Sequence, residues 1–218
     1  MPASPKMRTL SALLLLLPGV AAAQCPASAP VAPDGRILGH LPYGDVAPGE
    51  LVAAGPTLTA CRLRPEAAAD FARLAAAAEA SGLGRLYAGS CHRTLPWQES
   101  VFCREAVDDP TARAISVAPP GHSEHATGYA VDIAIRPSPN CPDAAGCMAA
   151  LPLYRWMAAN ASRFGFEQSF PGANKQGVKW EPWHWRWVGT SGSAPGAARA
   201  RFIFARARRD YPASPAVP

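Results

Sequence analysis

The chain has 218 residues, of which 49% are hydrophobic, and carries 21 Lys and Arg against 16 Asp and Glu, a formal net charge of +5. This length is enough for one domain with a hydrophobic core. Much of the basic excess lies in residues 199–209, and no stripe interleaves basic with aromatic side chains, so a nucleic-acid partner is not expected.

The N-terminal segment has the pattern of a secretory signal peptide. Lys6 and Arg8 precede an apolar run at residues 10–17, and small residues that end at Ala23 offer a cleavage site. The run is far shorter than the roughly 20 residues of a membrane-spanning helix. We therefore expect export, with a retained membrane anchor or a lipid anchor at Cys25 as the alternatives. The mature chain would keep 19 basic residues against 16 acidic ones.

Six cysteines follow the apolar run. An even number in an exported chain predicts disulfides rather than free thiols. No Cys-x-x-Cys occurs, and the spacing does not fit a four-cysteine zinc site. The sequence leaves the pairing open, and we expect two local loops and one longer link: Cys141–Cys147, Cys91–Cys103 and Cys25–Cys61.

Residues 24–60 are rich in Pro, Gly and Ala and show little periodicity, which indicates an extended arm around the domain. We expect His40 in this arm to be a surface histidine. The clearest helix follows at residues 65–80. It begins at a proline, carries acidic residues near its positive N-terminal end, and places Phe71 and Leu74 on one packing face.

The rest of the chain is expected to contain further strands and helices. The patterns predict strands at 86–90, 128–135, 166–170 and 183–188, helices at 97–106, 151–164 and 196–209, a loop at 137–147, and a disordered tail after Tyr211. Within strand 128–135, Asp132 shares a face with Ala130 and Ala134. A carboxylate on an otherwise apolar strand is costly to bury unless it is paired or bound to a metal.

Strand 183–188 alternates between two kinds of side chain. His184 and Arg186 face one side, and the other side carries three tryptophans that we expect to be mainly core: Trp183, Trp185 and Trp187. The strand therefore predicts one aromatic packing face and one polar working face.

Two stretches together supply the groups of a catalytic zinc site. They are Ser-Glu-His-Ala-Thr-Gly-Tyr-Ala-Val-Asp at 123–132 and Glu-Pro-Trp-His at 181–184. Catalytic zinc keeps protein ligands from His, Asp and Glu and leaves one position open to water. We predict that His125, Asp132 and His184 are the ligands, and that Glu181 is the base that takes a proton from the water.

These stretches resemble the zinc D-alanyl-D-alanine carboxypeptidase family of the VanY type, which belongs to the LAS metallopeptidases of peptidase family M15. The family motifs S-x-H-x-x-G-x-A-x-D and E-x-W-H are matched in full. A third motif, S-G-Y-R-S-x-x-x-Q, corresponds to residues 90–98, where Arg93 and Gln98 match while Cys91 and His92 replace Gly and Tyr. The resemblance covers roughly residues 60–190.

The resemblance implies an α+β fold of the D,D-peptidase and hedgehog-like type, with the zinc ligands on an antiparallel sheet and helices 65–80 and 151–164 packed on one side of it. It also implies a Zn²⁺ cofactor, a location in the periplasm or cell envelope of a bacterium, and hydrolysis of D-Ala–D-Ala-type bonds in peptidoglycan stem peptides. Arg93 would hold the C-terminal carboxylate of the substrate, and Gln98 and Ser123 would orient the peptide.

We therefore expect a monomer without a stable membrane span. Its parts would be a signal peptide at 1–23, the arm at 24–60, a zinc peptidase domain at 61–190 and a basic C-terminal segment at 191–218. A D,D-dipeptidase, an L,D-carboxypeptidase or a wall endopeptidase remains open within the same enzyme class. From a different class, a non-catalytic zinc or peptidoglycan-binding module remains open, although such a module has no need of a base.

Two further histidines lie near these motifs. His92 is a possible additional zinc ligand, whereas His122, which precedes the first stretch, is expected to bond locally.

Overall fold

The computed structural model describes residues 29–104 and 113–218, together with Met1. The predicted signal peptide and the alternative anchor at Cys25 lie outside the described residues. At the centre is a four-stranded antiparallel sheet in the order β3-β4-β6-β5. Its strands are β3 (Arg85–Ser90), β4 (Ala130–Arg136), β6 (His184–Trp187) and β5 (Phe166–Gln168).

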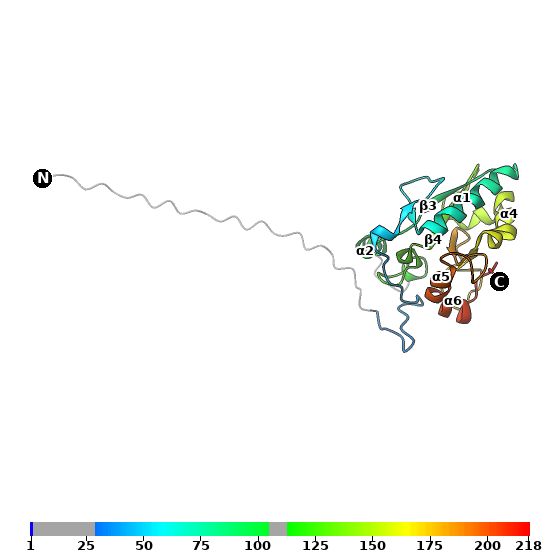
Figure 1. The fold of residues 1–218 in the computed structure, drawn as a ribbon. Coiled ribbons are helices and arrows are strands. Elements are labelled where there is room, and N and C mark those ends of the chain that lie inside the picture. The colour runs from blue at the N-terminus through cyan, green and yellow to red at the C-terminus, as the bar shows by residue number, and fades with distance from the viewer. Residues whose placement is uncertain (2–28, 105–112) are drawn as a thin grey trace.

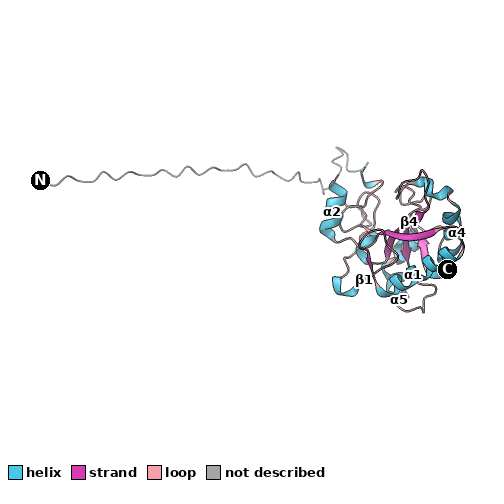
Figure 2. Ribbon diagram, turned by 90° about the horizontal axis from the view of Figure 1, so that it is seen from above, coloured by secondary structure: helices cyan, strands magenta, loops and turns pink. Residues whose placement is uncertain are grey.

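Two helices cover one face of this sheet, α1 (Pro65–Ala80) and α4 (Pro152–Asn160), as Figures 1 and 2 show. The apolar side chains of strands and helices form one buried cluster, which includes Phe71, Leu74, Val131, Ile133, Leu153, Met157, Trp185 and Trp187. The mixed helix-and-sheet architecture confirms the expected α+β fold. Because residues alternate along a strand, this packing leaves Asp132, His184 and Arg186 on the opposite face.

Helix α1 also contacts the core through polar groups. The indole Nε1 of Trp187 donates to Asp70 Oδ2 at 2.8 Å, and the hydroxyl of Tyr129 donates to Glu66 Oε1 at 2.7 Å. Buried indole and phenol groups need such partners. Both acidic side chains of the first turns of α1 therefore bond to the sheet layer as well as lying near the positive end of the helix.

The remaining elements differ from the predicted ranges mainly at their ends. Helix α2 (Leu95–Cys103) starts two residues before the predicted start, because Thr94 caps it by accepting a hydrogen bond from the Trp97 amide. The predicted helix 151–164 is α4 followed by the 3₁₀-helix η4 (Ala161–Phe164).

The predicted basic helix 196–209 is divided into α5 (Ala197–Ile203) and α6 (Ala205–Asp210). Phe204 stands between them and is fully buried, with its ring 5.6 Å from that of Tyr43. The hydrophobic cluster therefore includes Ala197 and Ala200 of α5 together with Phe204.

The prediction of a disordered tail after Tyr211 is wrong. The backbone of the tail pairs with Gln168 at the end of β5, through Gln168 N to Pro215 O at 3.0 Å and Ser214 N to Gln168 O at 3.2 Å. Val217 is only 2% exposed. Because β5 is an edge strand, its free backbone groups offer partners even to a segment rich in Pro and Ala.

The disulfides confirm one predicted pair and correct two. Cys141 is bonded to Cys147 as expected, whereas Cys61 is bonded to Cys91. This bond replaces the predicted Cys25–Cys61 and Cys91–Cys103 pairs. It forms because the short strand β2 (Arg62–Leu63) runs beside the residues after β3, where the amide of His92 donates to the carbonyl of Arg62 at 3.1 Å. Cys103 is also in a disulfide, and no cysteine of the described chain is free.

The arm lies against the domain through backbone hydrogen bonds. Tyr43 N donates to Gly121 O at 2.8 Å and Val46 N to Ala126 O at 2.9 Å. The arm then forms the 3₁₀-helix η1 (Pro48–Glu50) and strand β1 (Val52–Ala53), which pairs with β2. No helix in the described parts of the chain is long and apolar enough to cross a membrane.

The prediction of a surface position for His40 is wrong. The side chain is buried, and its Nε2 lies 2.7 Å from the carbonyl oxygen of Ala114. Burial lowers the pKa of His40 to about 4. The histidine is buried because the arm packs against the domain at this point, where the His40 ring also lies edge-on to the ring of Phe170 at 6.4 Å.

Candidate metal centre

The sheet register brings two of the predicted ligands together. Asp132 of β4 lies directly opposite His184 of β6, so both side chains project from the same face. His125 comes from the 3₁₀-helix η2 (Glu124–Thr127), which ends at Gly128 with φ of +73°. That left-handed turn favours glycine and directs the chain from η2 into β4. One potential ligand atom from each residue lies within 4.8 Å of the other two.

His125 has one ring nitrogen bonded and one free. Its Nδ1 donates to the carbonyl oxygen of Cys91 at 2.7 Å, which leaves the lone pair on Nε2. This buried Nε2 lies 3.3 Å from Asp132 Oδ2 but has no hydrogen-bond partner. Burial, aided by the charge of Arg93, lowers the pKa of His125 to about 4. The imidazole is therefore neutral at neutral pH, as a metal ligand must be.

His184 lies between two carboxylates. Its Nδ1 is 3.0 Å from Asp132 Oδ1, and its Nε2 is 3.0 Å from Glu124 Oε2. Burial alone would lower the pKa of His184, but the hydrogen bonds and charges of Asp132 and Glu124 outweigh it and raise the pKa to about 10. Burial would likewise raise the pKa of Asp132, but the two histidines hold it well below its usual range.

This donor set fits a zinc ion. Two imidazole nitrogens and one carboxylate oxygen are typical ligands of catalytic zinc. The buried, unpartnered Nε2 of His125 is the kind of atom that a metal would satisfy. His92 is not part of the group, because its Nε2 bonds to Asp45 Oδ1 of the arm at 2.8 Å.

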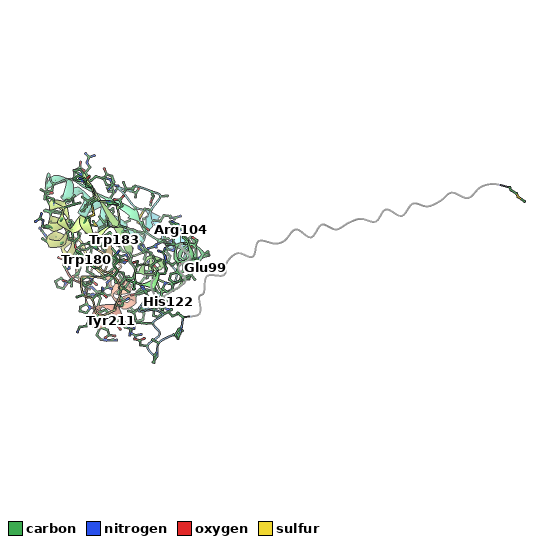
Figure 3. The ribbon with its side chains drawn as sticks, turned by 180° about the vertical axis from the view of Figure 1, so that it is seen from behind. Glu99, Arg104, His122, Trp180, Trp183 and Tyr211 are labelled. Carbon is green, nitrogen blue, oxygen red and sulfur yellow. A yellow bond between two sulfur atoms is a disulfide. The ribbon has the colours of Figure 1, made fainter. Side chains whose placement is uncertain are left out.

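The three residues line a cavity of about 450 Å³ together with Arg93, Ser123 and Glu181. Its wall also contains His40, His122 and Trp183; the last two are labelled in Figure 3. Trp183 is 8% exposed, so it belongs mainly to the core as expected, and it also borders the site. His122 Nδ1 lies 3.1 Å from the carbonyl oxygen of Pro120, which confirms the expected local bond.

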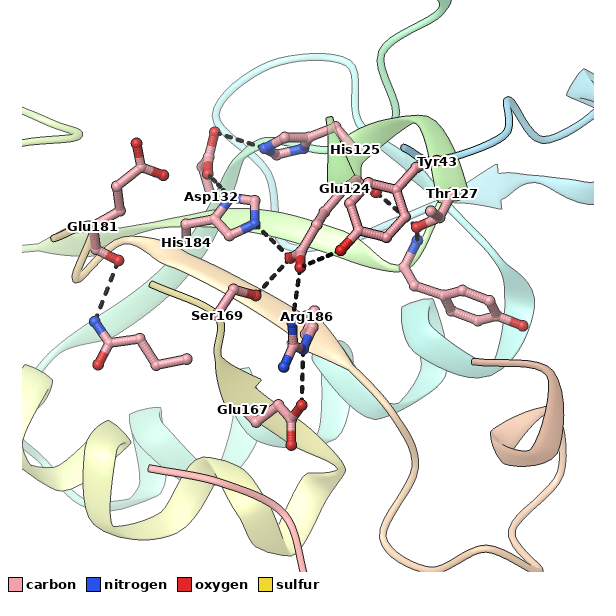
Figure 4. A network of polar contacts seen from close by, with 12 residues as sticks. Tyr43, Glu124, His125, Thr127, Asp132, Glu167, Ser169, Glu181, His184 and Arg186 are labelled. Carbon is pink, nitrogen blue, oxygen red and sulfur yellow. Dashed lines mark hydrogen bonds and ion pairs between the residues drawn. The ribbon is translucent and has the colours of Figure 1, made fainter. Parts of the chain in front are cut away.

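Glu181 is held by its backbone and presents its carboxylate to the cavity. Its amide donates to Phe170 O at 3.1 Å, and its carbonyl accepts from the amide of His184 at 3.0 Å and from Gln168 Nε2 at 3.2 Å. Figure 4 shows the carboxylate turned away from these bonds. Burial raises the pKa of Glu181 to about 8.

Arg93 is a mostly buried cation in the wall of the same cavity. Its Nη2 lies 3.8 Å from Asp132 Oδ2, and its buried Nε has no hydrogen-bond partner. Desolvation lowers its pKa, although an arginine remains charged at any physiological pH. The guanidinium therefore offers donors to an anion that enters the cavity.

The other two predicted substrate-binding residues lie at different depths. Ser123 lines the cavity, whereas Gln98 is not among the lining residues. Gln98 is 1% exposed and donates from Nε2 to the carbonyl oxygen of Ala118 at 2.6 Å. Ala118 itself lines the cavity, so Gln98 supports the wall from behind.

Sequence reasoning missed a group of polar residues beneath the site, drawn in Figure 4. Glu124 contacts Arg186, Ser169 and Tyr43 as well as His184. The signal that could have revealed it is Arg186, a charged residue predicted on the polar face of strand 183–188, which the structure places inside the sheet. A charge buried at such a position needs a carboxylate partner.

Comparison with known proteins gives two related sequences. A D-alanyl-D-alanine carboxypeptidase of Enterococcus faecalis is 41% identical over 78 residues, which cover 34% of this chain and 25% of that protein. YodJ of Bacillus subtilis, named as a candidate carboxypeptidase, is 35% identical over 132 residues, 58% of this chain and 46% of YodJ. The chain thus spans less than half the length of either relative.

Solved structures give the same picture of the fold. The L,D-carboxypeptidase LdcB matches with a TM-score of 0.60 and 28% identity, over 77% of each chain. A mutant of the vancomycin resistance D,D-pentapeptidase VanY in complex with Zn(II) matches with a TM-score of 0.53 and 26% identity, over 76% of this chain and 89% of that one. VanYB in complex with D-alanine-D-alanine matches with a TM-score of 0.51 and 26% identity, over 76% and 88%.

The family model of the VanY D-alanyl-D-alanine carboxypeptidase matches residues 60–190, more than half of the chain. This range contains the three candidate ligands as well as Arg93 and Glu181, which line the same cavity. The chain therefore belongs to the VanY D-alanyl-D-alanine carboxypeptidase family.

Proposed function

We propose that this chain is an exported, zinc-dependent D,D-carboxypeptidase that removes the terminal D-alanine from peptidoglycan stem peptides. The observation that carries the proposal is the convergence of a three-residue ligand group, a carboxylate and a buried guanidinium in one cavity. A structural or purely binding zinc site requires neither the base nor the guanidinium.

The proposed zinc site consists of His125, Asp132 and His184. When bound there, zinc would polarise the scissile carbonyl and acidify the attacking water. Glu181 takes the proton of that water as the new bond to carbon forms and then delivers a proton to the leaving amine. Burial raises the pKa of the Glu181 carboxyl to about 8, which favours the protonated form that the second step needs. A zinc ion beside Glu181 would lower this pKa and favour the carboxylate that the first step needs.

Arg93 determines which peptide bond of the substrate is cleaved. A planar guanidinium binds a carboxylate through two parallel hydrogen bonds. Since Arg93 Nη2 lies only 3.8 Å from Asp132 Oδ2, a carboxylate bound to it sits beside the zinc ligands. The bond next to the C-terminus is then the one presented for hydrolysis, and Ser123 in the same wall contacts the peptide.

Export is supported by the disulfides. Cys61–Cys91 and Cys141–Cys147 form in oxidising compartments and are rare in the cytosol. A periplasmic or envelope location would also place the chain beside its proposed substrate.

A second candidate is an L,D-carboxypeptidase, because LdcB matches this chain with a higher TM-score than VanY does. Both activities need a free C-terminal carboxylate, so Arg93 serves either one. They differ in the residue before the scissile bond, which is of the D configuration in one substrate and of the L configuration in the other.

The experiment is mass spectrometry of defined stem peptides after incubation with the zinc-loaded protein. We expect pentapeptides that end in D-Ala-D-Ala to lose one alanine, whereas loss of alanine from tetrapeptides alone would favour the L,D activity. Arg93→Ala should keep its zinc, yet lose a charge-assisted contact of about 1.5–3 kcal/mol on peptides with a free terminus. Equal losses on free and amidated peptides would contradict the carboxypeptidase assignment and favour an endopeptidase.

A further inference from the structure

The residue between the motif's serine and histidine, Glu124, has both carboxylate oxygens fully bonded although it is only 3% exposed. Oε2 accepts from Ser169 Oγ at 2.5 Å and lies 3.0 Å from His184 Nε2. Oε1 accepts from Arg186 at 2.8 Å and from the hydroxyl of Tyr43 at 3.3 Å. A carboxylate with these four contacts has one well-defined position.

We propose that Glu124 is a positioning residue of the metal site, which holds the His184 ring so that Nδ1 faces the ion. The carboxylate accepts the proton on Nε2, and this tautomer leaves the lone pair on Nδ1. Nδ1 is the atom that lies 3.0 Å from Asp132, on the side of the other candidate ligands. This inference rests on the proposed zinc site and adds a role for a side chain outside the three-residue ligand group.

Glu124 is itself held by a row of charges on the same face of the sheet, which leads through Arg186 to Glu167 of the edge strand β5. Arg186 donates from Nε to Glu167 Oε1 at 2.8 Å, and both side chains are about 1% exposed. Glu167 in turn accepts the amide of Val217 in the tail at 3.2 Å and lies 3.3 Å from Arg208 Nε. Because positive and negative groups alternate, each buried charge has a partner of opposite sign. A buried charge without such a partner would be strongly destabilising.

Two segments outside the matched region complete this support. Tyr43 belongs to the arm, and its ring packs 5.6 Å from that of Phe204 in the C-terminal segment. The guanidinium of Arg186 lies 5.3 Å over the same Phe204 ring. The arm and the C-terminal segment therefore act on the metal site through Glu124 and Arg186, although neither contributes a ligand.

The test compares zinc affinities, measured by competition with a chromophoric chelator, in folded variants. Glu124→Gln keeps the size of the side chain, but its amide cannot accept from both His184 and Arg186 with the same oxygens. We expect zinc affinity to fall about 10–100-fold, as is typical when a hydrogen-bond partner of a metal ligand is removed. Long-range ¹⁵N NMR of the zinc-loaded protein should show the proton of His184 on Nε2 in the wild type and a changed signal in the variant.

Milder variants keep the test decisive if Glu124→Gln does not fold. Ser169→Ala and Tyr43→Phe each remove one hydrogen bond to Glu124, and we expect each to lower zinc affinity several-fold. The matched control is Tyr129→Phe, which removes a buried hydroxyl bonded to Glu66 at 2.7 Å, near the same Phe204 ring but away from Glu124. It should lower stability and leave zinc affinity unchanged.

The outcomes separate this inference from the proposed function. Wild-type zinc affinity in folded Glu124→Gln, or in both mild variants, would overturn the positioning role and leave the zinc site intact. Equal zinc losses in Tyr43→Phe and Tyr129→Phe would also overturn it, because the effect would then follow stability alone. A wild-type protein that binds no zinc would overturn both proposals.

Discussion

Replacing Gly128 by alanine should destabilise the chain at the turn between two candidate ligands. Gly128 has φ of +73°, and a Cβ at this position would lie 2.7 Å from Leu51 Cδ2 and 3.2 Å from Val46 Cγ1. Both of these arm residues are buried, so neither can move away freely. Gly82 has the same φ of +73°, but a Cβ there would meet nothing within 4 Å.

The two glycines separate backbone strain from packing. A left-handed alanine costs about 1–2 kcal/mol, and the stiffer unfolded chain returns about 0.4–1 kcal/mol. Gly82→Ala should therefore lower the free energy of unfolding by about 1 kcal/mol. Overpacking adds about 1–3 kcal/mol at Gly128. For a chain of this size, 1 kcal/mol corresponds to a shift in Tm of about 2–4 °C.

Thermal unfolding of the zinc-free proteins measures the difference. We expect Tm to fall by about 3 °C in Gly82→Ala and by about 6–12 °C in Gly128→Ala. The zinc affinity should fall in Gly128→Ala alone, because its turn joins His125 to the strand of Asp132. Equal Tm shifts in the two variants would show that the arm does not restrict the turn, and would refute the packing argument.

Three other predictions concern charge. Zinc binding at pH 7 should release protons, because in the metal-free protein the pKa of His184 is about 10 and that of Glu181 is about 8. Calorimetry in buffers with different ionisation enthalpies measures how many protons are released. The pKa of His40 falls from 6.5 to about 4 on folding, so the unfolded chain binds more protons than the folded one between these pH values. The free energy of unfolding should therefore decrease by up to about 3 kcal/mol as the pH falls through this window. Denaturant unfolding at a series of pH values should show that the free energy of unfolding depends less on pH in His40→Gln than in the wild type. Arg186→Met removes the buried cation that Glu124 and Glu167 share, and the same assay at pH 7 should show a loss of about 3–5 kcal/mol in the free energy of unfolding.

The strands that carry the site could be predicted because the relevant signals are local. Strict alternation shows that His184 and Arg186 share one face and the tryptophans the other, whatever the strand pairs with. The helix at 65–80 is equally local, since its proline start and periodic apolar face lie within its own residues. Alternation within one strand does not predict that Asp132 and His184 lie opposite one another, because this depends on how β4 and β6 pair. Only the family motifs indicated that the two side chains meet.

The errors share a different cause, which is that tertiary neighbours decided the outcome. Cys61 bonds to Cys91 because β2 lies beside the end of β3, a contact across 30 residues of sequence. His40 is buried because the arm packs against Ala114 and Phe170, and Val217 is buried because β5 has a free edge. For His40 and Val217 the neighbouring residues in the sequence suggest solvent exposure, and for Cys61 no periodicity reveals the partner.

The same reasoning explains why a motif can locate a metal site and still leave its support undetected. Ligands lie within short, patterned stretches because each must project from a defined point of a strand or turn. Their supports need only reach the correct atom, so they come from wherever the fold brings a donor: Cys91 O for His125, and Glu124 with Tyr43 behind it for His184. The disulfide between Cys61 and Cys91 then has a consequence for the site. It fixes the segment whose carbonyl sets the tautomer of His125, in a chain where Cys91 and His92 replace the Gly-Tyr of the family motif.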